Sequence, residues 1–206
     1  MLKILGRKDS INVMKVLWAC EEVNLPFERV DVGGGFGFQN APDYRRLNPN
    51  GRVPTIDDRG FILWESNVIV RYLTSTYGGG RLVPHGKARW VGEQWIDWQQ
   101  TTLLPPMRTV FWQLVRTPPY KRDMPAVQAA HTTLLSLWPM LDDHLSHHAF
   151  IAGDEFTMAD IPVGCMAYRW YALDGIERPA MRHMEAWWKR LAERPGYQKH
   201  LTLPLT

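Results

Sequence analysis

The hydrophobic pattern of this chain changes near residue 84, and that change constrains the fold more than any other feature. Before it, short strand-like runs alternate with segments of helical spacing; after Leu82-Val83-Pro84, only helical spacing continues. Apolar residues recur at every second position in a half-buried strand and about every 3.6 positions in an amphipathic helix. The sequence therefore predicts an α/β domain over residues 1–80, a linker over 81–86 and an all-α domain over 87–206.

The predicted elements of the first domain follow the order β-α-β, connector, β-β-α. The strands fall at residues 2–5, 27–32, 54–57 and 61–64, and the helices near 13–20, 41–47 and 68–76. The turn at residues 58–60 is short enough for an antiparallel hairpin, whereas the β-α-β unit joins two parallel strands. Together they predict a mixed four-stranded sheet covered by helices.

The second domain contains one strongly signalled helix start. Thr157 and Asp160 have the spacing of a capping box, and Phe156 with Ile161 can form the flanking hydrophobic staple. The proline pair Pro105-Pro106 is expected to interrupt the helical pattern, because proline lacks the N–H that a helix interior needs. We expect several helices and no strands in this half.

Composition and charge exclude several classes of protein. The chain is 45% hydrophobic and 22% charged, which excludes a disordered chain. No run approaches the roughly 18 apolar residues of a membrane span, and residues 1–6 lack a signal-peptide core. The net charge of +3 is scattered and gives no concentrated basic face for nucleic acid. We expect a soluble, cytoplasmic protein that binds neither membranes nor nucleic acid.

The spacing of cysteine, histidine and glycine gives no cofactor motif. Cys20 and Cys165 lie far apart among apolar residues, so they are expected to be core thiols in a reducing compartment. His144 and His148 share a helical face, but no HExxH pattern is present and a helix end already favours imidazolium. The glycines at 33–37 lack the Lys-Ser/Thr of a phosphate loop and are expected to form a mobile loop. We predict no metal site.

Two polar residues stand at the start of the first predicted helix. Ser10 or Asn12 can cap that helix, and capping alone would explain either residue. A hydroxyl and an amide beside the exposed N–H groups of a helix start can also stabilise a thiolate. The residues alone leave both interpretations open.

Two further segments of the first domain can likewise be explained by a structural role or by a ligand-binding role. Pro54 opens a strand, where no ladder N–H is needed, whereas a cis Val53-Pro54 bond would leave the Val53 backbone free to pair with a peptide-like ligand. Ser66 can cap the helix that follows, but a helix start is also an anion site. Glu65 beside it suits an ammonium group, so the pair matches the head group of an α-amino acid.

In this order, and on this frame, the three segments resemble the glutathione transferase family, and the resemblance covers the full chain. The run from Trp95 to Gln99 and the capping box are similar to the family's helical domain. The resemblance implies a thioredoxin-like first domain with a cis proline at Pro54. It implies glutathione as co-substrate, bound through Gln39, Arg52, Val53, Glu65 and Ser66.

The pattern Ser10-x-Asn12 is similar to that of bacterial and fungal, nu-class-like members, which have a Thr/Ser-x-Asn pair in place of a catalytic tyrosine. The beta class has a cysteine where Ser10 falls, which argues against covalent mixed-disulfide chemistry through this protein. Gly51 stands where some classes have a histidine near the glycine end of glutathione, and Arg52 is the neighbouring residue that could replace that contact.

The resemblance implies a detoxifying transferase. Ser10 and Asn12 would stabilise the glutathione thiolate for attack on a hydrophobic electrophile, and the chain would form a homodimer. The electrophile is expected in the helical domain, at Met107, Arg108, Phe111 and Trp112. Two alternatives stay open: a glutathione-dependent disulfide or peroxide reductase, and a non-catalytic glutathione-binding or interaction module.

Overall fold

The computed structural model describes residues 1–206 and separates them into two compact units. The first unit comprises Met1–Val83 together with Pro195–Leu203, and the second comprises Pro84–Arg194 with Pro204–Thr206. The predicted helical domain of residues 87–206 included the segment that here belongs to the first unit. The segment belongs there because its short helix packs on the first helix of the chain.

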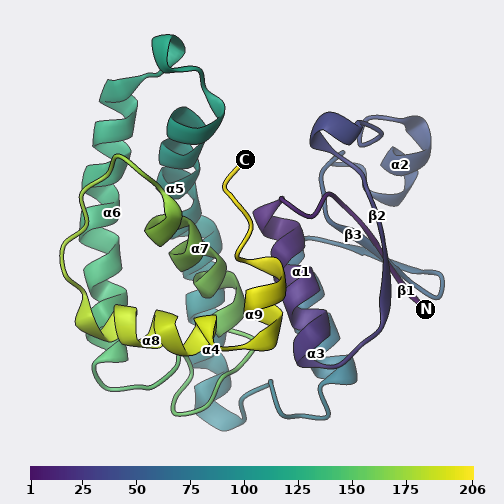
Figure 1. The fold of residues 1–206 in the computed structure, drawn as a ribbon. Helices are drawn as coiled ribbons and strands as arrows, with labels where there is room; N and C mark the ends of the chain where they lie inside the picture. The colour runs from purple at the N-terminus through teal and green to yellow at the C-terminus, as the bar shows by residue number, and fades with distance from the viewer. The chain divides into compact units, whose positions relative to one another are not determined.

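The first unit is built on a four-stranded mixed sheet with strand order β2-β1-β3-β4 (Figure 1). Its strands are β1 (Leu2–Leu5), β2 (Phe27–Val30), β3 (Thr55–Asp58) and β4 (Phe61–Trp64). β1 runs parallel to β2 and antiparallel to β3, and β3 pairs with β4 in antiparallel fashion. The predicted fold class is confirmed.

The β3–β4 hairpin closes in two residues, Arg59 and Gly60. Both have positive φ angles, 55° and 94°, and this conformation matches the right-handed twist of the flanking strands. The predicted turn also included Asp58, which instead ends β3. Its carboxylate accepts hydrogen bonds from the hydroxyls of Tyr72, at 2.7 Å, and Tyr77.

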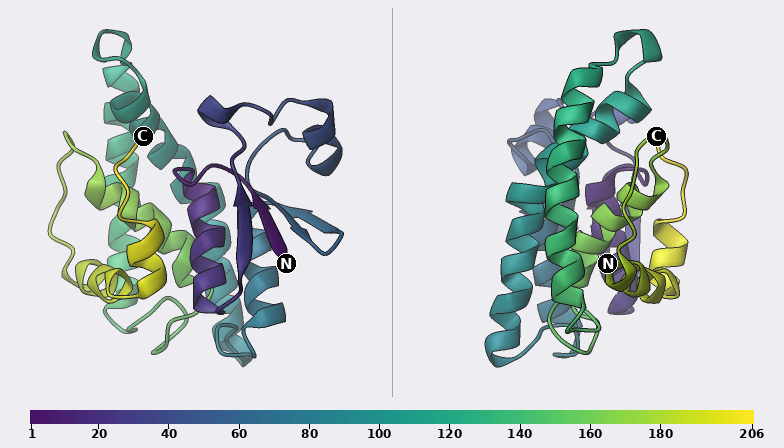
Figure 2. Two further views of the ribbon diagram at one scale, coloured as in Figure 1. Left: turned by 45° about the vertical axis from the view of Figure 1, so that its right-hand side comes forward. Right: turned by 90° about the vertical axis from the view of Figure 1, so that its left-hand side faces the viewer.

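Four helices complete the first unit, with a short 3-10 turn, η1, in the glycine run. They are α1 (Ile11–Glu22), α2 (Pro42–Leu47), α3 (Ser66–Tyr77) and α9 (Pro195–His200), and η1 covers Gly34–Phe36. α1 packs against both α3 and α9 (Figure 2). A Cβ on Gly196 would lie 2.6 Å from Cδ1 of Trp18, so only glycine permits this approach of α9 to α1.

The second unit contains five longer helices and no strand. They are α4 (Gly86–Trp98), α5 (Leu104–Phe111), α6 (Met124–Leu145), α7 (Asp160–Ala172) and α8 (Arg182–Ala192). α7 is buried almost all round and packs against α4, α5 and α8, which identifies it as the central helix. Trp138, Trp170 and Trp187 are fully buried in this half of the chain.

The prediction that Pro105-Pro106 interrupts the helix is wrong. A π-helical segment, η2 (Gln99–Leu103), joins α4 to α5, and Leu103 and Leu104 keep helical dihedral angles. The wider π turn accommodates two residues that cannot donate to the preceding turn. A second π segment, η3 (Trp112–Arg116), extends α5, and a 3-10 turn, η4 (Pro119–Lys121), follows it.

The predicted capping box at the start of α7 is confirmed. The Thr157 N–H donates to Oδ2 of Asp160 at 2.8 Å, and the Ala159 N–H donates to Oγ1 of Thr157 at 3.4 Å. These bonds satisfy N–H groups that a helix start leaves without intrahelical partners. None of the helices in the structure has the length and apolar character needed to cross a membrane.

Candidate active site

The start of α1 presents the Ser10 hydroxyl without using it as a cap. Ser10 is the N-cap residue, with φ −80° and ψ 122°, but its side chain makes no capping hydrogen bond. Its carbonyl accepts from the N–H groups of Val13 and Met14 at 2.9 and 2.8 Å. The capping role that the sequence left open for the Ser10 side chain is therefore not observed.

Asn12, in the first turn of α1, has a buried amide oxygen with no hydrogen-bond partner. Gln39, after the glycine loop, has the same feature at Oε1. A buried polar atom without a partner is uncommon, because leaving it unpaired costs about 1–3 kcal/mol. Rotation of either amide can present its oxygen or its NH2 group to a ligand.

The Val53-Pro54 peptide bond is cis, as the family resemblance implied. The carbonyl of Arg52 accepts hydrogen bonds from the hydroxyl of Tyr44 at 2.6 Å and from the amide of Asn48 at 2.8 Å. These two bonds fix the backbone before the cis bond, while the Arg52 side chain is exposed. Arg52 can therefore reach a ligand while its backbone is held still.

Two glycines bring Val53 close to other parts of the site. A Cβ on Gly6 would lie 2.5 Å from Val13 Cγ2 and 3.4 Å from Val53 Cβ, and one on Gly33 would lie 3.3 Å from Val53 Cγ1. Gly6 thus separates Val53 from the first turn of α1. Val53 therefore lies near Val13, in the first turn of the helix that begins after Ser10.

Glu65 and Ser66 begin α3, but not as the sequence suggested. Glu65, rather than Ser66, is the N-cap residue; it is exposed and has a φ angle of +73°. A residue other than glycine in this region is strained, and such strain clusters at functional sites. Ser66 is buried in the first turn, so the capping role considered for Ser66 is not the one observed.

Lys15 is a buried residue beside Ser66 that sequence reasoning did not select. Its side chain is 0% exposed, and Nζ donates to Oδ1 of Asn67 at 3.0 Å and to Oγ of Ser66 at 3.5 Å. Lysine is almost never fully buried without a specific partner. Nζ of Lys15 therefore lies beneath the start of α3.

The residues predicted for the second substrate divide into two pairs. Met107 and Phe111 are buried, at 0% and 2% exposure, whereas Trp112 is 46% exposed and Arg108 is exposed. Four-residue spacing puts Met107 and Phe111 on one helical face and Arg108 and Trp112 on the next. The second pair lines a pocket of about 420 Å³, whereas Met107 and Phe111 lie in the core; the second-substrate site stays a prediction.

Neither cysteine has the environment of a nucleophile. Cys20 and Cys165 are free thiols and both are buried. Burial raises the pKa of the Cys20 thiol to about 12, which leaves almost no thiolate at neutral pH. Sulfur chemistry at this site must therefore use a sulfur atom that a ligand supplies.

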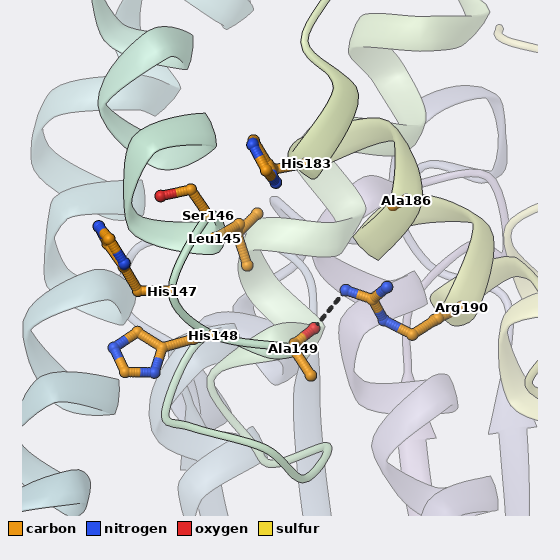
Figure 3. A pocket seen from close by; sticks show the side chains of 8 residues that line it. All are labelled: Leu145, Ser146, His147, His148, Ala149, His183, Ala186 and Arg190. Carbon is orange, nitrogen blue, oxygen red and sulfur yellow. Dashed lines mark hydrogen bonds between the residues drawn. The ribbon is translucent and has the colours of Figure 1, made fainter.

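A histidine-rich pocket lies in the second unit, between the end of α6 and α8 (Figure 3). It has a volume of about 330 Å³, and His147, His148, His183 and Arg190 are among its lining residues. Arg190 donates to the carbonyl of Ala149 at 2.6 Å. No three or more His, Cys, Asp or Glu side chains are grouped to hold a metal ion.

Comparison with known proteins identifies the family. The family model described as "Glutathione S-transferase, N-terminal domain" matches residues 2–75. The model described as "Glutathione S-transferase, C-terminal domain" matches residues 103–195. GstB, a glutathione S-transferase of Escherichia coli (strain K12), is 37% identical over 209 residues, covering 100% of both chains. The chain belongs to the glutathione S-transferase family.

Other members of the glutathione S-transferase family support the same assignment. Glutathione S-transferase 3 of Zea mays is 31% identical, over 96% of this chain and 92% of its own. The theta-class glutathione S-transferase of Xanthomonas axonopodis pv. citri, solved with glutathione bound, has a TM-score of 0.96 and 41% identity. That comparison covers 100% of this chain and 99% of the other.

Proposed function

We propose that this glutathione S-transferase binds glutathione on its first unit and activates it as a thiolate for attack on an electrophilic small molecule. One observation carries the proposal. Asn12 and Gln39, two residues proposed to contact glutathione, each have a buried side-chain oxygen without a partner. Native proteins seldom leave such atoms unpaired. A donor group of glutathione would satisfy the Gln39 oxygen, and rotation of the Asn12 amide would turn its NH2 group toward a thiolate in place of its oxygen.

The thiolate would lie at the start of α1. A free thiol has a pKa of about 8.5, so lowering it by two units needs about 2.7 kcal/mol of differential stabilisation. Three contributions together can supply that energy: a hydrogen bond from the Ser10 hydroxyl, which makes no capping bond, a second hydrogen bond from the Asn12 amide, and the helix dipole. Neither side chain accepts a proton at neutral pH, so the thiol proton would leave to solvent or to a carboxylate of glutathione itself.

The γ-glutamyl head group would lie at the start of α3. Its carboxylate would accept from the Ser66 hydroxyl and the first-turn N–H groups, and its ammonium group would pair with exposed Glu65. The Val53 backbone would pair with the peptide part of glutathione, and Gln39 and Arg52 would bind its glycine end. This assignment uses the starts of α1 and α3.

Titration calorimetry with glutathione tests the assignment. Losing a hydrogen bond to a charged group costs about 1.5–3 kcal/mol, so Glu65→Ala or Ser66→Ala should weaken glutathione binding at least tenfold. Exposed Glu28→Ala on β2 serves as a matched control and should bind as the wild type does. Wild-type affinity in both site variants would overturn the assignment.

Kinetic assays separate conjugation from the reductase and from a non-catalytic module. We expect conjugation of a halogenated aromatic compound to be faster than reduction of hydroxyethyl disulfide. Because both protein thiols are buried, a reductase reaction would have to take both sulfur atoms from glutathione. Faster disulfide reduction would favour the reductase, and binding without either reaction would favour the module.

We propose further that the enzyme is a cytoplasmic homodimer with a detoxifying role. The first unit exposes Phe61 and Trp64 on β4 and Val68 on α3, and exposed apolar side chains of this kind suit contact with a second copy. Light scattering at micromolar concentration should give twice the chain mass. A monomer would overturn the proposal of a dimer without affecting the glutathione site.

A further inference from the structure

Five side chains in the second unit form an alternating series of cations and aromatic rings. In order, they are Arg169, Phe111, Arg116, Trp112 and Arg108. The distances from each guanidinium carbon to the adjacent ring centroid are 3.8, 5.1, 4.8 and 5.8 Å. Each lies within the range of about 6 Å in which a cation is attracted to a ring face.

The two ends of this series differ in exposure. Arg169 and Phe111 are buried, whereas Trp112 is 46% exposed and Arg108 is exposed. Nε and Nη2 of Arg116 donate to the carbonyl oxygen of Thr206 at 3.2 and 3.1 Å, which holds that guanidinium in place. The buried end fixes the orientation of the rings, and the outer end is accessible to a ligand.

The accessible end borders the pocket identified above. Pro105, Arg108, Thr109, Trp112 and Gln113 line its volume of about 420 Å³, which is within the usual range for small-molecule sites. The lining includes an aromatic surface and a cation, and it includes no carboxylate. The side chain of Arg108 makes no ion pair or hydrogen bond in the structure, only its contact with the Trp112 ring.

The surrounding sequence strengthens the positive charge. Residues 104–123 contain four arginines or lysines and one aspartate, although the whole chain has a net charge of only +3. Positive charges around a depression attract anions from solution. A guanidinium also binds a carboxylate through two parallel hydrogen bonds, which an ammonium group cannot do.

We propose that the Trp112 pocket selects aromatic electrophiles that carry an anionic substituent. Trp112 stacks on the ring of the electrophile, and Arg108 binds the anionic group. The inference rests on the proposed function, since it names the class of the second substrate. A suitable probe is 4-chloro-3-nitrobenzoate: the glutathione thiolate attacks the ring carbon that bears chlorine, a C–S bond forms, and chloride leaves with the C–Cl electron pair.

The test compares this probe with neutral 4-chloro-3-nitrobenzamide. For each compound, kcat/KM is divided by the rate constant of its uncatalysed reaction with glutathione, and the benzoate-to-benzamide ratio is formed. We expect a ratio above one that declines as sodium chloride is added. Arg108→Gln should lower the ratio about three- to fivefold, as expected for one partly exposed ion pair.

Arg89→Gln is the matched control. Arg89 also lies over an exposed tryptophan, at 5.6 Å from the Trp90 centroid, but it has Glu93 at 4.0 Å. The control should keep the wild-type ratio. The inference is overturned if Arg108→Gln leaves the ratio unchanged or if Arg89→Gln lowers it equally.

A binding measurement separates failure of this inference from failure of the proposed function. If neither compound is conjugated, the proposed function fails, and saturation-transfer NMR with unreactive 3-nitrobenzoate and 3-nitrobenzamide then tests the pocket. Preference for the benzoate that is lost in Arg108→Gln supports the anion-binding pocket. Equal binding of the two compounds overturns it.

Discussion

The start of α7 in the second unit and the starts of α1 and α3 in the first unit treat their polar groups in opposite ways. At α7, both oxygens of Asp160 are fully used: Oδ1 accepts from the Ile151 N–H and the Trp187 indole, and Oδ2 accepts from the N–H and hydroxyl of Thr157. At α1 and α3, the N-cap residues Ser10 and Glu65 make no capping bond. A satisfied helix start stabilises the fold, whereas an unsatisfied one leaves donors for a ligand.

The largest effect should come from breaking the satisfied start. Asp160→Ala would leave the N–H groups of Ile151 and Thr157 and the Trp187 indole without an acceptor, lowering the free energy of unfolding by about 3–5 kcal/mol. Burial raises the pKa of Asp160 to about 6, so urea unfolding is measured above pH 7, where the carboxylate is ionised. The exposed neighbour Asp154→Ala should change stability little, and equal losses would contradict the comparison.

The second effect should appear in activity and not in stability. Ser10→Ala and Asn12→Ala should lower kcat/KM about tenfold and move its pH profile to higher pH, because each removes a donor to the thiolate. A helix cap normally contributes about 1 kcal/mol, but Ser10 makes no capping bond, so the melting temperature of Ser10→Ala should be nearly unchanged. An unaltered pH profile in both variants would assign thiolate stabilisation to other groups.

Lys15 sharpens the comparison further, because its side chain is buried and contacts Ser66 and Asn67 at the start of α3, where the N-cap residue makes no capping bond. Lys15→Met keeps the volume and removes the charge beneath Ser66, so glutathione should bind about fivefold more weakly while thermal stability is retained or increased. Lys15→Arg, which keeps the charge, should recover part of the affinity. Loss of stability with unchanged affinity in the soluble variant would make Lys15 purely structural.

The smallest effect concerns how stability depends on pH through His144, which contacts Ile151 near the start of α7. Nε2 of His144 bonds to the Ile151 carbonyl at 2.8 Å, and burial lowers the pKa of this imidazole. The unfolded chain therefore binds a proton more readily, so the contribution of His144 to stability is present above about pH 6.5 and is lost as the pH falls. His144→Asn should show a flatter decline of melting temperature on acidification, and an identical decline would contradict this account.

Much of this architecture could be predicted from local pattern. The change of rhythm near residue 84, the hairpin and the capping box each depend on neighbouring residues, and the structure has all three. The prediction that Pro105-Pro106 interrupts the helix was wrong, because a π turn can accommodate prolines that a regular α-helix cannot. That choice depends on the packing around the helix, which no local pattern reports.

The site was less accessible to sequence reasoning. The polarity of Ser10, Asn12, Glu65 and Ser66 made them visible candidates, but Lys15 was not selected because lysine on a helix usually marks the solvent face. One signal was present: Lys15 lies four residues after Ile11 and three before Trp18, within an apolar stripe. Its partners Ser66 and Asn67 come more than fifty positions later, a separation that local spacing cannot bridge.

The packing of α9 on α1 has a consequence for the order of events during synthesis. Trp18 is fully buried, and the Tyr197 ring meets it edge-on with centroids 5.4 Å apart. A nascent chain that has emerged only to Val83 lacks Pro195–Leu203, the last part of its first unit. Trp18 must remain uncovered on that side while the ribosome makes the whole intervening helical segment. The first unit is therefore unable to finish folding until Pro195–Leu203 has been translated.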